Sequence, residues 1–147
     1  MVLKIAQKLQ EQEKNYRIIT PYAGQTTLIE SSMKELELNW ADKCFNVDSF
    51  QGEFSLILVV VFEILNFIIG NEDDFIIISI VRSRTLGFLN DLRRTNVMLS
   101  RCKRGMFIVS SQQFLAGVAA ETLVGQFLKK MESPVWLSAA DIEGGNF

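Results

Sequence analysis

The sequence contains no histidine and two cysteines among its 147 residues. Without histidine one common zinc ligand is missing, and Cys44 and Cys102 lie far apart, without metal-binding spacing. We therefore expect no metal site in this chain. Two isolated thiols are typical of proteins from a reducing compartment, which favours a cytoplasmic or nuclear location.

The sequence also lacks a large net charge and a secretory leader. The formal net charge is -2, so any contact with nucleic acid must come from a local basic patch rather than from bulk charge. Residues Met1 to Glu13 form a polar, amphipathic segment without a continuous apolar core, so we expect no signal peptide. The length indicates a single domain, residues 1–147.

Two motifs of ATP-hydrolysing enzymes are missing as well. The chain has no phosphate-binding loop of the form G-x-x-x-x-G-K-[ST], and no acidic D-E-x-x motif follows a predicted strand in the required order. This sequence therefore offers nothing to cradle a β-phosphate or to hold magnesium. We expect that it neither binds nucleotide tightly nor hydrolyses ATP on its own.

The pattern between Asp73 and Ser111 predicts a strand, a loop, a helix and a second strand. Phe75–Val81 and Met106–Val109 are β-branched runs too short for core helices. The intervening helix can be capped by Asp91 and carries three residues on one face: Arg94, Val97 and Arg101. This is the pattern of one parallel β-α-β unit, so we predict an α/β fold with a parallel sheet.

The rest of the chain continues the same alternation. Hydrophobic spacing predicts helices at Val2–Gln12, Gly24–Leu36 and Ser111–Met131, and strands at Tyr16–Ile19 and Lys43–Val47. In the second helix we expect Leu28, Ile29 and Met33 to face inward. We expect the tail at 133–147 to dock through Val135, Trp136 and Leu137. Ligands of parallel sheets bind at the carboxyl ends of the strands. We therefore expect three loops to meet at one edge: Thr20–Gln25, Asp48–Gly52 and Arg82–Asp91.

Five short strings carry a resemblance to a known family. In chain order they are T-P-Y-x-x-Q at Thr20–Gln25, V-D-S-F-Q-G at Val47–Gly52, S-x-V-R-S at Ser79–Ser83, G-F-L-x-D at Gly87–Asp91, and R-R-x-N-V-x-L-S-R-C at Arg93–Cys102. Together they resemble the superfamily-one helicases related to the nonsense-mediated-decay helicase and senataxin. The resemblance covers motif regions 18–52 and 71–111 and implies the second RecA-like domain of such a helicase. That is a parallel-sheet P-loop NTPase fold without its own phosphate-binding loop.

The resemblance implies roles for several residues at a nucleotide site. Arg101 matches the arginine finger of the last motif, and Arg94 would support it or reach the other domain. Gln51, Gly52 and Glu72 match positions that help to hold the nucleotide. The alternative for the arginines is a solvated helix face paired with nearby carboxylates: Asp73, Asp74 or Asp91.

The resemblance also implies a single-strand binding surface. Tyr22 could stack on a base and Gln25 could bond a phosphate or a sugar, although both could instead be turn residues packed under their loop. Ser49 and Gln51 offer donors to backbone phosphates or 2'-hydroxyls. The complete set of predicted nucleic-acid contacts is Thr20, Pro21, Tyr22, Gln25, Asp48, Ser49, Arg82 and Asn96.

Residues 53–70 interrupt the family pattern. The run Phe54–Ile69 is nearly all apolar, but it contains Glu63 and Asn66 and is short for a membrane helix. Without residues 53–70 the chain would read V-D-S-F-Q-G-N-E-D-D-F, which resembles the continuous family motif. Because the codons at both ends of the segment can supply GT and AG boundaries, we hypothesise a retained intron. The alternative is a structural insertion that forms a buried strand pair or a core helix.

Three functions are consistent with these observations. The first is the carboxyl-terminal motor domain of an ATP-dependent helicase. The complete enzyme would need ATP and Mg²⁺. The partners of this domain would be a first RecA-like domain and single-stranded RNA or DNA, and we expect no association with a membrane. The second is a catalytically incompetent fragment that binds nucleic acid or a partner protein. The third is a small membrane protein anchored by Phe54–Ile69.

Overall fold

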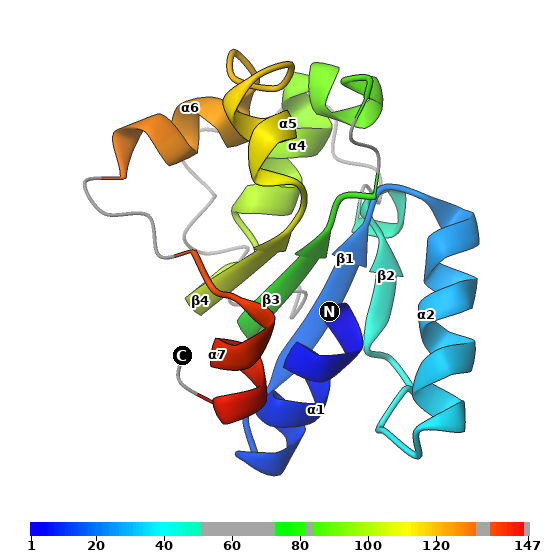
Figure 1. Ribbon diagram of the computed structural model, residues 1–147. Coiled ribbons are helices and arrows are strands. Elements are labelled where there is room, and N and C mark those ends of the chain that lie inside the picture. Colours follow the sequence, from blue (N-terminus) through cyan, green and yellow to red (C-terminus); the bar gives the residue numbers. More distant parts are fainter. Residues whose placement is uncertain (51–72, 82–83, 132–135, 146–147) are drawn as a thin grey trace.

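The computed structural model describes residues 1–50, 73–81, 84–131 and 136–145 (Figure 1). Its elements in chain order are α1 (Val2–Glu11), β1 (Tyr16–Thr20), α2 (Ala23–Glu35), β2 (Cys44–Asn46), the 3₁₀ helix η1 (Val47–Phe50), β3 (Asp73–Ser79), the 3₁₀ helix η2 (Gly87–Asn90), α4 (Leu92–Leu99), β4 (Cys102–Val109), α5 (Gln112–Ala116), α6 (Leu123–Lys130) and α7 (Ala139–Gly144). Strands therefore alternate with helices, as the sequence predicts.

The four strands form one parallel sheet in the order β2-β1-β3-β4. Ile18 of β1 lies opposite Cys44 of β2 on one side and opposite Ile77 of β3 on the other. β-Branched residues suit such a strand because their side chains pack well on a pleated surface that is covered on both faces. The prediction of an α/β fold with a parallel sheet is confirmed.

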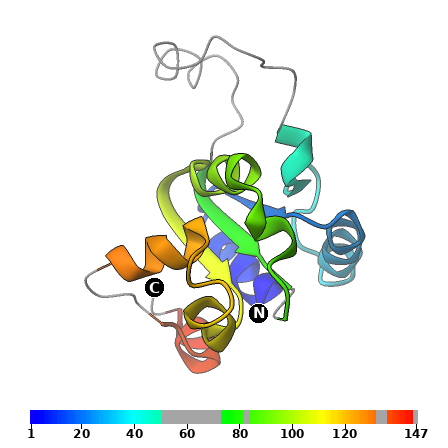
Figure 2. The ribbon, with the colours of Figure 1, turned by 90° about the horizontal axis from the view of Figure 1, so that it is seen from above.

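Two hydrophobic clusters cover the two faces of this sheet. Successive strand residues point to opposite faces, so Ile76 and Ile78 pack with Met98 of α4, whereas Ile77 packs with Leu9 of α1. Figure 2 shows α4 and α1 on opposite sides of the sheet. Each fully buried isoleucine contributes about 1.5–3 kcal/mol of transfer free energy, so these central strands hold the two helical layers in place.

The predicted single helix at Ser111–Met131 is wrong. Two shorter helices, α5 and α6, occupy this stretch, and the chain turns between Gly117 and Thr122. Gly117 ends α5, and the Thr122 hydroxyl caps α6 by accepting a hydrogen bond from the backbone of Gly125. The apolar residues along the stretch gave no sign of the turn, because both short helices bury apolar residues.

Two further details differ from the sequence predictions. Leu28 was expected to face inward from α2, but 64% of its surface is exposed, whereas Ile29 and Met33 are buried as expected. The tail contains a helix, α7, that lies beside α1 and packs Leu137 and Ile142 into the second cluster. Trp136 stays 47% exposed.

Residues 53–70 and Val135 lie outside the described part of the chain. In the described part, no helix has the length and apolarity needed to cross a membrane.

Candidate functional site

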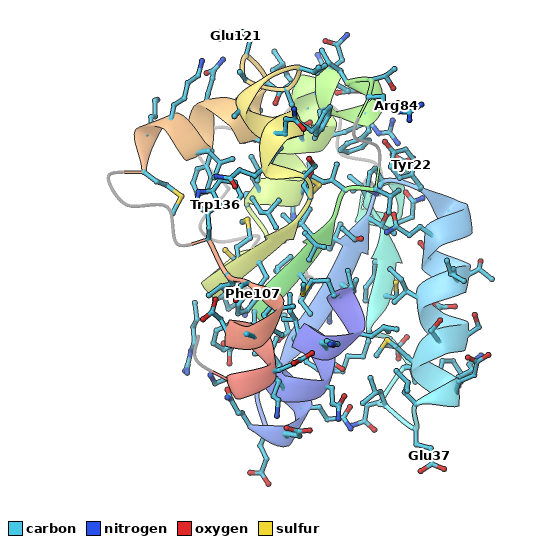
Figure 3. The ribbon with its side chains drawn as sticks, in the orientation of Figure 1. Tyr22, Glu37, Arg84, Phe107, Glu121 and Trp136 are labelled. Atoms are coloured by element: carbon cyan, nitrogen blue, oxygen red, sulfur yellow. The ribbon has the colours of Figure 1, made fainter. Side chains whose placement is uncertain are left out.

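Segments from distant parts of the sequence lie at the carboxyl ends of the strands. Thr20 ends β1 and Ser79 ends β3, and η1 directly follows β2. Helix α4 contacts both η1 and η2, which brings the second and fourth motif strings together. Figure 3 places Tyr22 and Arg84 at this edge of the sheet. The described parts of the three predicted loops therefore lie at one edge of the sheet.

A chain of hydrogen bonds fixes the first loop of this edge. The buried Thr20 hydroxyl donates to Oε1 of Gln25 at 2.5 Å, and Nε2 of Gln25 donates to the buried Ser79 hydroxyl oxygen. Both polar ends of the Gln25 amide therefore bond protein groups. Gln25 therefore ties β1, α2 and β3 together.

The other residues of the first loop differ in exposure. Pro21 is buried. Tyr22 is half-buried and packs against the cluster of Ile19 and Met98. Tyr22 is therefore partly accessible at the carboxyl edge and also packs against the core.

Arg94 and Asp48 are brought together, although the sequence analysis assigned them to different ligands. The Nη2 atom of Arg94 donates to Oδ2 of Asp48, forming an ion pair between α4 and η1. The guanidinium carbon of Arg94 lies 4.5 Å from the centre of the Phe88 ring in η2. In this structure Arg94 thus joins three elements of the carboxyl edge.

Helix α4 starts at this edge and points away from it. Oδ1 of Asp91 accepts hydrogen bonds from the backbone N–H groups of Arg93 and Arg94, so the predicted cap is present. The side chains of Arg93 and Asn96 are exposed. Thr95 and Met98 are buried, so α4 has one packed face and one solvated face.

Arg101 lies at the opposite end of α4 from Arg94. Its Nε donates to the carbonyl oxygen of Val97 at 3.1 Å, and its own carbonyl oxygen accepts from the backbone of Asp73 at 3.3 Å. Helix α4 ends at Leu99, so Arg101 does not extend its face. The helical residues from Arg94 to Leu99 alone span roughly 7 Å along the axis, at about 1.5 Å per residue, and Arg101 follows them. The structure therefore holds the two arginines apart.

The carboxylates proposed as alternative partners of these arginines are used elsewhere. Asp73 pairs with Arg17 at 3.5 Å, and Asp74 pairs with Arg104 at 3.4 Å. Asp91 caps α4 through backbone groups rather than through an arginine side chain. Arg94 pairs with Asp48.

Several predicted site residues cannot be placed. Gln51, Gly52, Glu72 and Arg82 lie outside the described residues, as does the side chain of Ser49. Two residues that the sequence analysis did not assign, Ser79 and Phe88, contact predicted site residues. For Ser79 the signal was a hydroxyl at the end of an otherwise apolar strand, and for Phe88 it was an aromatic residue within a motif string.

Comparisons with known proteins agree with the motif strings. Residues 1–113 match the family model described as an AAA domain. The chain is 32% identical over 118 residues to an ATP-dependent helicase of Methanocaldococcus jannaschii, covering 78% of this chain and 14% of that relative. It is 37% identical over 107 residues to regulator of nonsense transcripts 1 of Dictyostelium discoideum, and 36% identical over 107 residues to ATP-dependent helicase upf1 of Schizosaccharomyces pombe. Each of these two matches covers 67% of this chain, but 7% and 10% of the respective relatives, so the chain spans a small part of the proteins it matches.

Proposed function

The chain belongs to the AAA-domain family of superfamily-one helicases related to regulator of nonsense transcripts 1, and we propose that it is the carboxyl-terminal motor domain of an ATP-dependent RNA or DNA helicase. One observation carries this proposal. Motif segments far apart in the sequence, Thr20–Gln25, Val47–Phe50 and Gly87–Asp91, meet at the carboxyl edge of the sheet. The proposal includes a cytoplasmic or nuclear location.

In this proposal the carboxyl edge contacts a single strand. Tyr22 is partly exposed at this edge and offers a ring for stacking, and Arg84 is an exposed cation beside it. Arg93 is an exposed cation in the first turn of α4. A net charge of -2 does not oppose this, because phosphate contacts depend on the local arrangement of cations. Thr20 and Gln25 would then shape the loop rather than contact the strand, since they bond each other and Ser79.

The end of α4 presents Arg101 to the nucleotide of a facing first RecA-like domain. Phosphoryl transfer builds negative charge on the γ-phosphoryl oxygens, and a guanidinium can stabilise that charge by several kcal/mol. The hydrogen bond from Nε to the Val97 carbonyl orients the Arg101 side chain before the domains close. Gln51, Gly52 and Glu72 would complete the nucleotide contacts. The phosphate-binding loop and the magnesium ligands come from the other domain.

The experiment is a chimaera in which this chain, with or without residues 53–70, replaces the matching segment of the Schizosaccharomyces pombe helicase. ATP turnover is measured with single-stranded RNA or DNA. We expect turnover to be stimulated by the strand, and Arg101→Ala to lower kcat by about a thousandfold or more. Lys103→Ala removes an exposed cation two residues away and should leave kcat unchanged.

Two results would contradict this proposal. If both chimaeras lack turnover while the isolated chain binds single strands in a salt-dependent manner, the catalytically incompetent binding fragment is the better account. If turnover is present but Arg101→Ala matches Lys103→Ala, Arg101 is not the arginine finger. The parent helicase would then have to draw the cation from another residue.

A further inference from the structure

Arg94 of α4 is held by contacts with two other elements. Its Nη2 pairs with Asp48 of η1, and its guanidinium stacks 4.5 Å from the Phe88 ring of η2. The Nε atom of Arg94 is buried, and 28% of the side-chain surface is exposed, compared with 52% for Asp48. The planar guanidinium stacks on Phe88 through its face and bonds Asp48 through its edge. A lysine side chain has no planar group that could make both contacts.

A hydrogen bond joins the backbone of Asp48 to the end of β2. The backbone N–H of Asp48 donates to Oδ1 of Asn46 at the end of β2 at 2.9 Å. Asp48 therefore transmits the position of the β2 end to α4 through Arg94. Because η1 follows β2 and η2 follows the loop after β3, the contact of Arg94 with Asp48 and Phe88 depends on the positions of two separate loops of the carboxyl edge.

The other end of α4 holds Arg101. The helix is eight residues long, is capped by Asp91 at its start, and is packed through Thr95 and Met98. The carbonyl of Val97 in its last turn accepts the hydrogen bond from Nε of Arg101. A small shift of the first turn therefore reaches Arg101 through one short, hydrogen-bonded element.

We propose that the contact of Asp48, Arg94 and Phe88 is a positioning device that couples occupancy of the carboxyl edge by a single strand to the placement of Arg101. This inference rests on the proposed function. It makes Arg94 a residue that supports Arg101 through α4 rather than one that reaches the other domain. It also changes Asp48 from a strand contact to the partner of Arg94.

The test uses the chimaera and measures ATP turnover with and without saturating single-stranded RNA. The ratio of the two rates is the strand stimulation. We expect Asp48→Ala and Arg94→Ala each to lower this ratio about tenfold, and the double variant to lower it no further, because both remove the same contact. Circular dichroism of each variant establishes that it is folded.

Two further variants separate coupling from general destabilisation. Exchanging the charges, with Asp48→Arg and Arg94→Asp together, should restore part of the stimulation. Arg104→Ala breaks a partly exposed ion pair with Asp74 at the amino edge and should leave the ratio unchanged. A general loss of folded enzyme would lower turnover with and without the strand by the same factor, so it would leave this ratio unchanged.

Three outcomes would overturn the inference. Additive effects of Asp48→Ala and Arg94→Ala would mean that the two residues act on different ligands. A loss of about a thousandfold in unstimulated turnover for Arg94→Ala, without rescue by the charge exchange, would make Arg94 a nucleotide contact. Absence of strand-stimulated turnover in the unsubstituted chimaera would remove the proposed function and this inference with it.

Discussion

Thr95 and Thr122 are both buried threonines, but their hydroxyls are in opposite situations. Among the described residues, the Oγ1 atom of Thr95 is buried without a hydrogen-bond partner. A buried hydroxyl that lacks a partner costs free energy, and valine has nearly the same shape without that group. We expect Thr95→Val to raise the free energy of unfolding by about 1 kcal/mol. Urea denaturation monitored by circular dichroism measures this change.

Thr122→Val is the matched control for this prediction. The Thr122 hydroxyl donates to the carbonyl of Ala119 at 2.6 Å and accepts from the backbone N–H of Gly125 at 3.3 Å. The same substitution should therefore lower the free energy of unfolding by about 1–2 kcal/mol through loss of the α6 cap. A decrease for Thr95→Val of similar size would show that its hydroxyl has a partner in solution.

The two cysteines should differ in reactivity. Burial, followed by the charge of Glu30, raises the pKa of the Cys44 thiol to about 12. Cys102 is partly exposed at the start of β4. At pH 8 we expect one thiol to react quickly with 5,5'-dithiobis(2-nitrobenzoate), and Cys102→Ser to abolish this fast phase. Denaturant should release the second thiol, and a fast reaction of Cys44 in the folded chain would contradict its burial.

The raised pKa of Cys44 also makes the free energy of unfolding depend on pH. Folding favours the neutral Cys44 thiol, so its contribution is fully present below the unfolded-state pKa of about 8.5. This contribution is lost as the pH rises from there towards 12. Cys44→Ala should therefore flatten the fall in stability over that alkaline range.

At the scale of elements, the contacts of Gly125 help to explain why α5 and α6 replace the single helix that the sequence predicts. A Cβ atom on Gly125 would lie 2.3 Å from the carbonyl oxygen of Ala119 and 2.5 Å from that of Ala120. Helix α6 can therefore pack against the preceding turn only with glycine at this position. The glycine was visible in the sequence, but the backbone that it contacts is set by tertiary structure, which periodicity does not report.

Two Gly→Ala substitutions should have opposite effects. In Gly125→Ala, the new methyl group would overlap backbone atoms, so we expect a loss of about 3 kcal/mol in unfolding free energy. In Gly24→Ala, no atom of the described residues lies within 4 Å of the added Cβ. Because alanine loses less conformational entropy in a helix, Gly24→Ala should gain about 0.5–1 kcal/mol. Thermal unfolding of both variants beside the unsubstituted chain provides the comparison.

At the scale of the molecule, the sheet and the loops at its carboxyl edge could be predicted, because short β-branched runs alternating with helices specify a parallel sheet. The motif strings then locate loops at the ends of strands. The sequence could not indicate that Arg94 pairs with Asp48, because these residues are 46 positions apart and their contact depends on how α4 crosses η1. Nor could it show that α4 ends before Arg101, since the helical period continues through that residue.

The described sheet leaves room for a shorter connection between β2 and β3. Asn46 lies opposite Thr20, and Phe75 lies opposite Tyr16, with β1 between the two strands. At about 3.3 Å per residue and 4.8 Å between strands, Asn46 and Asp73 are separated by roughly 22 Å. Residues 47–52 and 71–72 can span about 25 Å even if η1 keeps its compact 3₁₀ conformation. Residues 53–70 are therefore not needed to close the sheet.

We expect the chain without residues 53–70 to fold, with a free energy of unfolding about 1 kcal/mol higher because a shorter connection costs less closure entropy. Removing the apolar run Phe54–Ile69 should also raise the monomeric fraction, since long apolar runs with little charge are typical of aggregation-prone sequences. Urea denaturation and size-exclusion chromatography with light scattering measure the two effects.

Replacing residues 53–70 with a glycine-serine segment of equal length separates these causes. This variant should match the deletion in monomeric fraction but should lack its gain in unfolding free energy, because the connection keeps its full length. If the glycine-serine variant folds and the deletion does not, the reach calculated from the strand register is too short. If both fail to fold, residues 53–70 contribute packing to the native domain, and a retained intron is no longer tenable.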